Sequence, residues 1–387
     1  MRGVKSVLSY IQRTDKIYWI LMFLISAYSL LLLKTVPNPE NKTFSYFTTQ
    51  LIAIIGGYIG AILLTVIDYR EISNFWYVVA GFCLFLIFYT LLFGKAIVNT
   101  GGINAKAWIK LPGGLTFQPS ELVKIGFIIT FSKHLDELKK RDLLKNPIHI
   151  ILLAFHALIP IGLVHLQGDD GAGVIFFCMF IAMAFGAGIQ LRYFAALFAV
   201  VAAAIPAAWK YGILSEYQKK RILVTYNLES DKLNYGLQQI QGRLSIGSGG
   251  LWGRGLFVSP RVNKGSVPVQ QQDFIFSVAG EQLGFIGCFI LITLLLLLLW
   301  RTLHIARNST DLLGSSICMG FFGMVASQMI FNLGMCMDLL PVIGVTLPFF
   351  SAGGSSAACL YFGFGLVVNV YMHKMNMDKV SVKKVSY

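Results

Sequence analysis

Long apolar stretches, separated by short polar segments, dominate the pattern of hydrophobic and polar positions along this chain. A helix that crosses a bilayer needs about 20 mostly apolar residues. The chain offers ten such windows, of which the fourth and sixth are short and carry polar or glycine residues. The pattern predicts an all-α integral membrane protein with about ten transmembrane helices, in which residues 1–387 form a single polytopic domain. The predicted helices span residues 17–33, 49–66, 75–93, 122–135, 148–164, 174–187, 193–209, 274–300, 312–333 and 357–372.

Composition agrees with the membrane class. Of the 387 residues, 56% are hydrophobic and 13% are charged, against roughly 25% charged in a soluble domain. The net charge of +14 has two explanations, nucleic acid or the Lys and Arg that gather in cytoplasmic loops beside anionic lipid. No nucleic-acid motif accompanies the charge, so we expect contact with membrane lipid and no nucleic acid. The six cysteines form no CxxC pair and indicate neither a zinc site nor disulfides.

The distribution of Lys and Arg predicts the orientation in the membrane. Ten spans place both termini on one side. No small-residue cleavage site follows the first apolar run, so we expect this run to be an uncleaved first span. If that side is the cytoplasm, the cytoplasmic segments hold 17 Lys and Arg, and the short outer loops hold five. The positive-inside rule therefore predicts that both termini are cytoplasmic.

One outer segment, residues 214–272 between the seventh and eighth predicted spans, is much longer than the others. It is basic, and its centre reads GRLSIGSGGLWGRG. A loop of this length is usually functional or disordered, and its aromatic residues and regularly spaced polar residues favour function. A basic loop that faces outward suits an anionic substrate such as a lipid pyrophosphate.

Asp273 is the first candidate for chemistry, because ionisable residues at membrane depth are costly and are functional by default. It stands where the long loop enters the eighth span. The alternative is a helix cap, although Phe276 three residues later gives no capping box. Glu281 lies two turns further along the same helix, and its alternative role is an interhelical hydrogen bond.

The sequence FQPSELVK places a second charged pair at the start of the fourth span. Glu121 and Lys124 are three residues apart and share a helix face, with Ser120 as the candidate cap. They form either an ion pair that stabilises the helix or a substrate site in which Lys124 holds a phosphate. Asp169 and Asp170 lie in a glycine turn and are expected to be solvated. Residues 332–356, rich in proline and glycine, are expected to form a cavity wall.

Several long stretches carry a family resemblance. They are NAKAWIKLPGGLTFQPSELVK, LQGDDGAG, EYQKKRI, LQQIQGRLSIGSGGLWGRG, QDFIFSVAGEQLGFIG and DLLPVIGVTLPFFSAGGSS, in that order from about residue 104 to 356. Together they resemble the SEDS family of shape, elongation, division and sporulation proteins, which includes RodA, FtsW and SpoVE. The chain resembles a divergent, RodA-like member. Residues 104–108, 167–172 and 268–273 depart from the family's motifs, since they read NAKAW, QGDDGA and PVQQQD.

The resemblance implies a peptidoglycan glycosyltransferase of the bacterial plasma membrane that polymerises lipid II with a class B penicillin-binding protein as partner. Asp273 corresponds to the family's essential acidic residue. We expect it to act as a base or as a ligand of a divalent cation, Mg²⁺ or Mn²⁺. No organic cofactor is expected. The leaving pyrophosphate would be stabilised by Lys124, Arg243 or the metal. The implied substrate-binding residues are Lys106, Gln118, Ser120, Glu121, Lys124, Gln241, Arg243, Glu281 and Ser351.

Two other classes of function stay open at this point. A flippase or transporter of lipid-linked precursors would share the spans and the buried charges, but such proteins often carry internal repeats, and none is evident. A non-catalytic scaffold for a class B penicillin-binding protein would tolerate the loss of Asp273. The sequence does not decide between elongation, division and sporulation.

Overall fold

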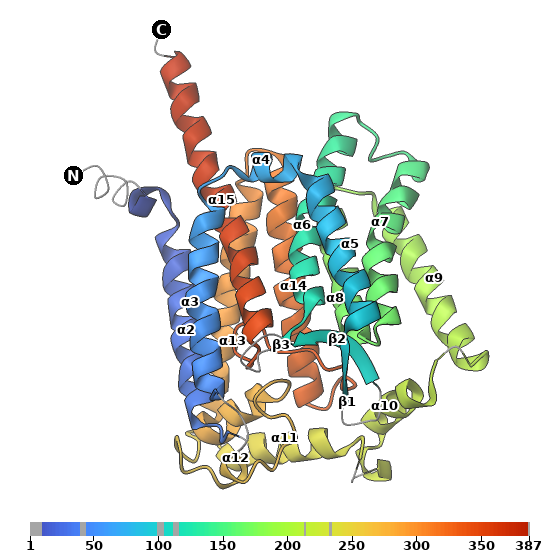
Figure 1. Cartoon of the computed structure of the whole chain (residues 1–387), viewed down its shortest axis with the longest axis vertical. Coiled ribbons are helices and arrows are strands. Elements are labelled where there is room, and N and C mark those ends of the chain that lie inside the picture. Colours follow the sequence, from blue (N-terminus) through green and yellow to red (C-terminus); the bar gives the residue numbers. More distant parts are fainter. Residues whose placement is uncertain are drawn as a thin grey trace.

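The computed structural model describes residues 10–38, 44–98, 104–110, 116–212, 214–231 and 234–385. Each of the ten predicted spans is a helix in it (Figure 1), so the predicted all-α membrane fold is confirmed. The ten helices are α2 (Lys16–Thr35), α3 (Tyr46–Leu64), α5 (Trp76–Phe93), α6 (Pro119–Lys140), α7 (Pro147–Leu166), α8 (Asp170–Gly186), α9 (Leu191–Lys210), α13 (Ile275–Arg307), α14 (Leu312–Cys336) and α15 (Gly354–Val385).

Eight of these helices are long and apolar enough to cross a membrane by themselves. The other two are α6, which carries charged residues, and α8, which has only 17 residues. Both pack against α14. A helix that is enclosed by other helices can carry polar side chains toward the protein interior, which explains the weak hydrophobic signal of α6. Helix α8 is apolar, and its signal was weak because the helix is short.

Close helix packing relies on small residues, as is common in membranes. Helix α15 packs along α3, where a Cβ atom on Gly57 would lie 2.7 Å from the side chain of Tyr361. One turn further, a Cβ atom on Gly365 would lie 2.6 Å from the backbone of Ala61. Larger residues at these glycines would therefore push the two helices apart.

A small antiparallel sheet, which the sequence analysis did not predict, lies between α5 and α6. Its strands are β1 (Lys95–Val98), β2 (Asn104–Lys110) and β3 (Thr116–Phe117), in the order β1-β2-β3. Strands this short occupy too few residues for a two-residue period to stand out. The short helix α4 (Tyr69–Asn74) lies at the opposite end of the bundle (Figure 1).

The long outer segment is largely helical in the part that the structure describes. It contains α10 (Glu216–Tyr226), the 3₁₀ helix η2 (Leu228–Asp231), α11 (Leu237–Gly249) and α12 (Pro260–Asn263). A reciprocal capping box between Ser215 and Gln218 fixes the start of α10. Helix α11 packs against α13, so this segment forms a cover over one end of the bundle (Figure 1).

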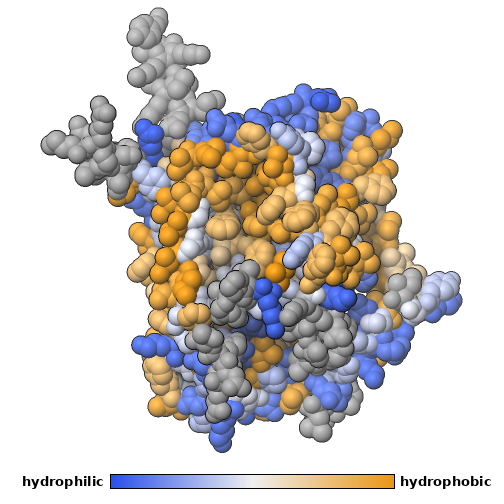
Figure 2. Space-filling view, in the orientation of Figure 1, coloured by the Kyte–Doolittle hydropathy of each residue, from blue (hydrophilic) through white to orange (hydrophobic). Residues whose placement is uncertain are grey.

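The arrangement fits a bilayer. On the face that Figure 2 shows, an apolar band lies between two more polar ends. Helix α2 begins and α15 ends at one of these ends, and α10, α11 and α12 cover the other (Figure 1). The last turn of α6, with Lys139 and Lys140, and its connection to α7, with Arg141 and Lys145, lie at the end where α2 begins.

Candidate functional site

Asp273 lies directly before α13, where the cover that contains α10, α11 and α12 joins the membrane bundle. The N-cap of α13 is Phe274, and no side chain caps this helix. The interpretation of Asp273 as a helix cap is therefore wrong. Asp273 is partly buried. Among the described residues its carboxylate has no hydrogen-bonding partner, so its oxygens are available for a ligand.

The main chain at Asp273 is fixed by Asn332 of α14. The Nδ2 atom of Asn332, which is fully buried, donates to the carbonyl oxygens of Asp273 at 2.8 Å and of Val345 at 2.7 Å. One amide thus joins the start of α13 to the irregular segment between α14 and α15. Because a buried carbonyl without a partner is costly, this bridge holds Asp273 against that segment.

Ser351 fixes the residues immediately before Asp273. Its hydroxyl donates to the carbonyl oxygen of Gln272 at 2.5 Å and accepts the N–H of Leu347 at 2.8 Å. The N–H of Ala352 also donates to the carbonyl of Gln271 at 2.7 Å. The segment that was expected to form a cavity wall therefore lies against Asp273. The structure gives Ser351 a positioning contact, and its predicted contact with substrate stays a prediction.

Burial raises the pKa of the Asp273 carboxyl to about 6, and the positive charge of Arg221 opposes this rise. Arg221 belongs to α10. Its Nη1 donates to the carbonyl of Val342 at 2.7 Å, and its guanidinium lies 4.4 Å from the centre of the Tyr217 ring. A carboxylate with a pKa near the operating pH suits a general base, since it is ionised and still accepts a proton readily.

A second polar cluster lies at the starts of α6 and α8. Lys124 donates to Glu121 at 2.9 Å, and the two residues are 1% and 7% exposed, so the predicted ion pair is present and enclosed. The carboxylate of Asp169 accepts hydrogen bonds from Gln118 at 2.7 Å and Ser120 at 3.2 Å. The cap of α6 is Gln118 and not Ser120 as predicted, because Pro119 is the first helical residue.

Asp169 and Asp170 are not the freely solvated pair that the glycine turn suggested. Asp169 caps α8 by accepting the N–H of Ala172 at 3.1 Å. Burial raises the pKa of Asp169 above its ordinary value. Its hydrogen bonds and the charge of Lys124 offset only part of this rise. Asp170 accepts a hydrogen bond from Gln218 of α10 at 2.6 Å. Helix α10 thus connects the polar starts of α6 and α8 with the region of Asp273.

Glu281 holds α12 to α13, and Gln241 holds α12 to α11. Arg261 of α12 donates its backbone N–H to Glu281 at 2.8 Å and its guanidinium to the Gln241 side chain at 2.5 Å. The predicted structural alternative for Glu281, a hydrogen bond that holds elements together, is therefore present, with α12 as the partner. Nearby, Gly284 has φ +66° where Gly253 meets the α13 backbone, a conformation that favours glycine.

The remaining candidates lie toward the outer surface. Arg243 of α11 forms an ion pair with Asp338 at 3.1 Å, and its side chain is 60% exposed. Lys106 is exposed on β2. The structure gives neither residue a contact with Asp273, and their predicted roles in substrate binding stay predictions.

Sequence reasoning missed Arg221 and Asn332 as site residues. Arg221 lies in the quoted stretch EYQKKRI, but only the fold brings it near Asp273. Asn332 gave a signal that was overlooked, since it is an amide near the end of a mostly apolar span. A polar group at such a position usually has a hydrogen-bonding partner inside the protein.

The donor set bears on the expected metal. Among the described residues, no group of three or more His, Cys, Asp or Glu side chains is placed to hold a metal ion. Mg²⁺ is commonly bound through one or two carboxylates together with substrate phosphates. Asp273 as a lone carboxylate therefore does not suit a resident metal centre, but it suits an ion that arrives with a pyrophosphate.

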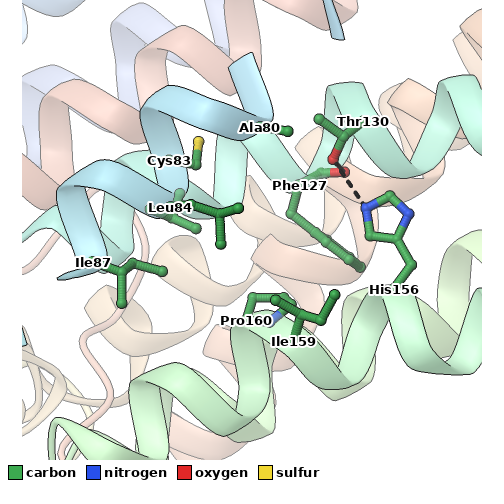
Figure 3. A pocket seen from close by; sticks show the side chains of 11 residues that line it. Ala80, Cys83, Leu84, Ile87, Phe127, Thr130, His156, Ile159 and Pro160 are labelled. Carbon is green, nitrogen blue, oxygen red and sulfur yellow. Dashed lines mark hydrogen bonds between the residues drawn. The ribbon is translucent and has the colours of Figure 1, made fainter. Parts of the chain in front are cut away.

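A separate apolar hollow of about 110 Å³ lies between α5, α6 and α7 (Figure 3). Its polar groups are Thr130 and His156, joined by a hydrogen bond of 3.3 Å. Its other lining residues are Ala80, Cys83, Leu84, Ile87, Val123, Gly126, Phe127, Ile159 and Pro160. The contacts of Asp273 come from other elements, so this hollow is distinct from the Asp273 site.

The chain is similar to known cell-wall proteins. A family model described as "Cell cycle protein", which covers FtsW, RodA and SpoVE, matches residues 12–376. Stage V sporulation protein E of Bacillus subtilis is 32% identical over 334 residues, which are 85% of this chain and 88% of the relative. The peptidoglycan glycosyltransferase MrdB of Escherichia coli is 32% identical over 301 residues, which are 77% and 80% of the two chains.

Solved structures support the same relationship. A chain from a peptidoglycan synthase complex, studied for its coordination of polymerization and crosslinking, matches with a TM-score of 0.79 and 29% identity, over 93% of this chain and 98% of that one. The rod shape determining protein RodA of Thermus thermophilus matches with a TM-score of 0.67 and 28% identity, over 92% and 96% of the two chains. Fold, motifs and comparisons together show that this chain belongs to the FtsW, RodA and SpoVE family of multi-pass membrane proteins.

Proposed function

We propose that this protein is a peptidoglycan glycosyltransferase that polymerises lipid II at the outer face of the bacterial plasma membrane. The observation that carries the proposal is Asp273, which is fixed where the outer cover enters the membrane. Its carboxylate has no hydrogen-bonding partner among the described residues, and burial raises its pKa to about 6. The names of its relatives MrdB and FtsW as peptidoglycan glycosyltransferases support the same activity.

The reaction joins two lipid-linked sugars. The oxygen of a sugar hydroxyl on one lipid attacks the anomeric carbon of the sugar on the other lipid. The bond from that carbon to the pyrophosphate oxygen breaks, and this oxygen keeps the electron pair. The hydroxyl proton passes to the carboxylate of Asp273, which acts as the positioned base that a weak nucleophile requires. The lipid pyrophosphate leaves with the negative charge.

Asp273 also has a role if Mg²⁺ or Mn²⁺ accompanies the substrate. It would supply one carboxylate ligand, while the pyrophosphate would supply the others. A divalent ion bound in this way neutralises charge that develops on the leaving pyrophosphate. The fixed main chain at Asp273 would hold the carboxylate in place for either role.

We also propose an orientation of the protein in the membrane and a partner protein. Both termini lie in the cytoplasm, which the basic connection between α6 and α7 at the end where α2 begins supports. The cover formed by α10, α11 and α12 then faces outward. A class B penicillin-binding protein is the partner that crosslinks the product. The solved complex in which polymerization and crosslinking are coordinated supports this partner.

The experiment is a polymerisation assay with purified full-length protein and fluorescent lipid II, run with and without the class B partner. We expect glycan strands from the wild type and none from Asp273→Ala. A matched liposome assay measures translocation of lipid II. Translocation without strands would show a flippase and overturn the proposal. Strands that need the partner but persist in Asp273→Ala would show that this chain is a scaffold.

A further inference from the structure

We propose that Arg221 binds the pyrophosphate of the lipid-linked substrate and stabilises the charge that this group gains when it leaves. This inference rests on the proposed glycosyltransferase function and adds a residue to its site. The sequence singled out Lys124 and Arg243 for this task. The surroundings of these cations in the folded chain favour another assignment.

Lys124 and Arg243 are both engaged elsewhere. Lys124 is 1% exposed and paired with Glu121 at 2.9 Å. Moving it to a substrate would leave the Glu121 carboxylate buried and unpaired, which is strongly unfavourable. Arg243 is paired with Asp338 at 3.1 Å, and its side chain is 60% exposed, so any charge interaction there is weakened by solvent. Neither arrangement provides a free, partly desolvated cation beside Asp273.

Arg221 has the required properties. A guanidinium carries five N–H donors in a planar fork that matches phosphate oxygens. In the described part of the chain, one donation is found, to Val342, and the guanidinium stacks on Tyr217. No ion pair within 4.0 Å joins Arg221 to a carboxylate of the described residues. Asp273 and Asp170 still attract it electrostatically. Arg221 is therefore partly buried, oriented and left with free donors.

The spacing between Arg221 and Asp273 is set by one short segment of backbone. Arg221 donates to the carbonyl of Val342, while Asn332 joins the carbonyls of Val345 and Asp273. The cation and the base are thus held by carbonyls three residues apart in the same irregular segment. Because their side chains do not pair directly, a substrate group can lie between them. The base would face the hydroxyl, and the guanidinium would face the leaving phosphate.

The charge balance of the reaction agrees with this placement. When the bond to the anomeric carbon breaks, the phosphate oxygen keeps the electron pair and its negative charge increases. A cation already fixed in a site with little water stabilises that charge without reorganising. The same cation helps to keep Asp273 ionised until the hydroxyl proton arrives. Arg221 would therefore stabilise both the leaving phosphate and the ionised form of the base.

The test compares Arg221→Gln with Lys220→Gln in the full-length protein. Both variants lose one positive charge from α10, but Lys220 is exposed. We expect Arg221→Gln to lower kcat/KM for lipid II about 10²-fold, the usual loss when one charge-stabilising donor is removed. We expect Lys220→Gln to stay within about twofold, since exposed charges contribute little. Arg221→Lys should fall between wild type and Arg221→Gln, because it keeps the charge without the fork.

A binding measurement separates this role from a structural one. Inorganic pyrophosphate, titrated into each purified variant by calorimetry, should bind at least about tenfold more weakly to Arg221→Gln than to Lys220→Gln. In Arg221→Gln, the acidic limb of the pH–rate profile should move to a higher pH than in wild type. The reason is that Arg221 lowers the pKa of Asp273, so its loss lets that pKa rise further. The titratable groups that face this pair are Cys336 of α14 at Asp273, and Asp170, Tyr217 and Tyr235 at Arg221.

Two outcomes would overturn the assignment. Unchanged pyrophosphate affinity in Arg221→Gln with a lower melting temperature would show that Arg221 only supports the backbone at Val342. Unchanged kcat/KM in that variant would show that the leaving group is stabilised elsewhere. If wild type made no glycan strands, the proposed function would fail, whereas the pyrophosphate titration would still decide whether Arg221 forms an anion site.

Discussion

Replacing Lys124 with methionine removes one partner of an ion pair that the fold encloses between α6 and its neighbours. Lys124 is 1% exposed and Glu121 is 7% exposed, with 2.9 Å between the charged atoms. Methionine keeps most of the volume of the side chain and deletes the charge. The carboxylate of Glu121 then stays buried without a cation.

The expected magnitude follows from that burial. Removing one partner of a buried pair costs about 3–5 kcal/mol, because the remaining charge is uncompensated. The pair between Lys219 and Glu216 on α10 is the matched control. It has the same short separation, 3.0 Å, but Glu216 is 79% exposed. Exposed pairs contribute about 0–1 kcal/mol. We therefore expect Lys124→Met to lower the free energy of unfolding by at least about 2 kcal/mol more than Lys219→Met.

The measurement is reversible unfolding in mixed detergent micelles, followed by helical circular dichroism. The double variant Glu121→Gln/Lys124→Met should recover at least half of the loss, since neither partner is then left charged and unpaired. Equal losses in Lys124→Met and Lys219→Met would refute the idea that the pair is enclosed. A double variant no more stable than Lys124→Met would assign the loss to packing.

Three further predictions concern the site. Asn332→Leu leaves the carbonyls of Asp273 and Val345 without their shared donor. It should lower the free energy of unfolding by about 2–4 kcal/mol and reduce kcat for lipid II more than KM, as steady-state kinetics would show. Glu281→Gln keeps the acceptor for the Arg261 N–H, so its rate of strand synthesis should stay within about threefold of wild type. Glu281→Ala loses this acceptor and should lower the melting temperature by several degrees. The rate of polymerisation should fall as pH drops through about 6, because Asp273 has a raised pKa and its protonated form cannot accept the hydroxyl proton. A flat profile between pH 5 and 7 would contradict the role of Asp273 as base.

The ten spans were predictable because a membrane helix requires a long apolar run, which is visible in the sequence. Even α6 and α8 were found, although charges in the first and the short length of the second weakened their signal. The sheet between α5 and α6 was not predictable in this way. Its strands have two to seven residues, and pairing between strands leaves no long run in the sequence.

The position of Asp273 at a membrane boundary was predictable, and a carboxylate there is conspicuous. Its surroundings were not, because they depend on contacts between distant parts of the chain. The amide of Asn332 is 59 residues from Asp273, and the bond from Arg221 to Val342 spans 121 residues. Sequence spacing identifies neighbours on one helix, such as Glu121 and Lys124, but it does not show that Arg261 would bond with Glu281 and Gln241.

We propose that the carboxylate of Asp273 takes part in glycan polymerisation. The most direct measurement is the rate of strand synthesis from lipid II by Asp273→Asn, with Glu216→Gln as the matched exchange of an exposed acid for its amide. Removing a positioned base costs about 10²–10⁴-fold. We predict that Asp273→Asn works at least about 10²-fold more slowly than Glu216→Gln while its melting temperature stays close to wild type. Strand synthesis by Asp273→Asn at a rate close to that of Glu216→Gln would contradict a role of the Asp273 carboxylate in the reaction.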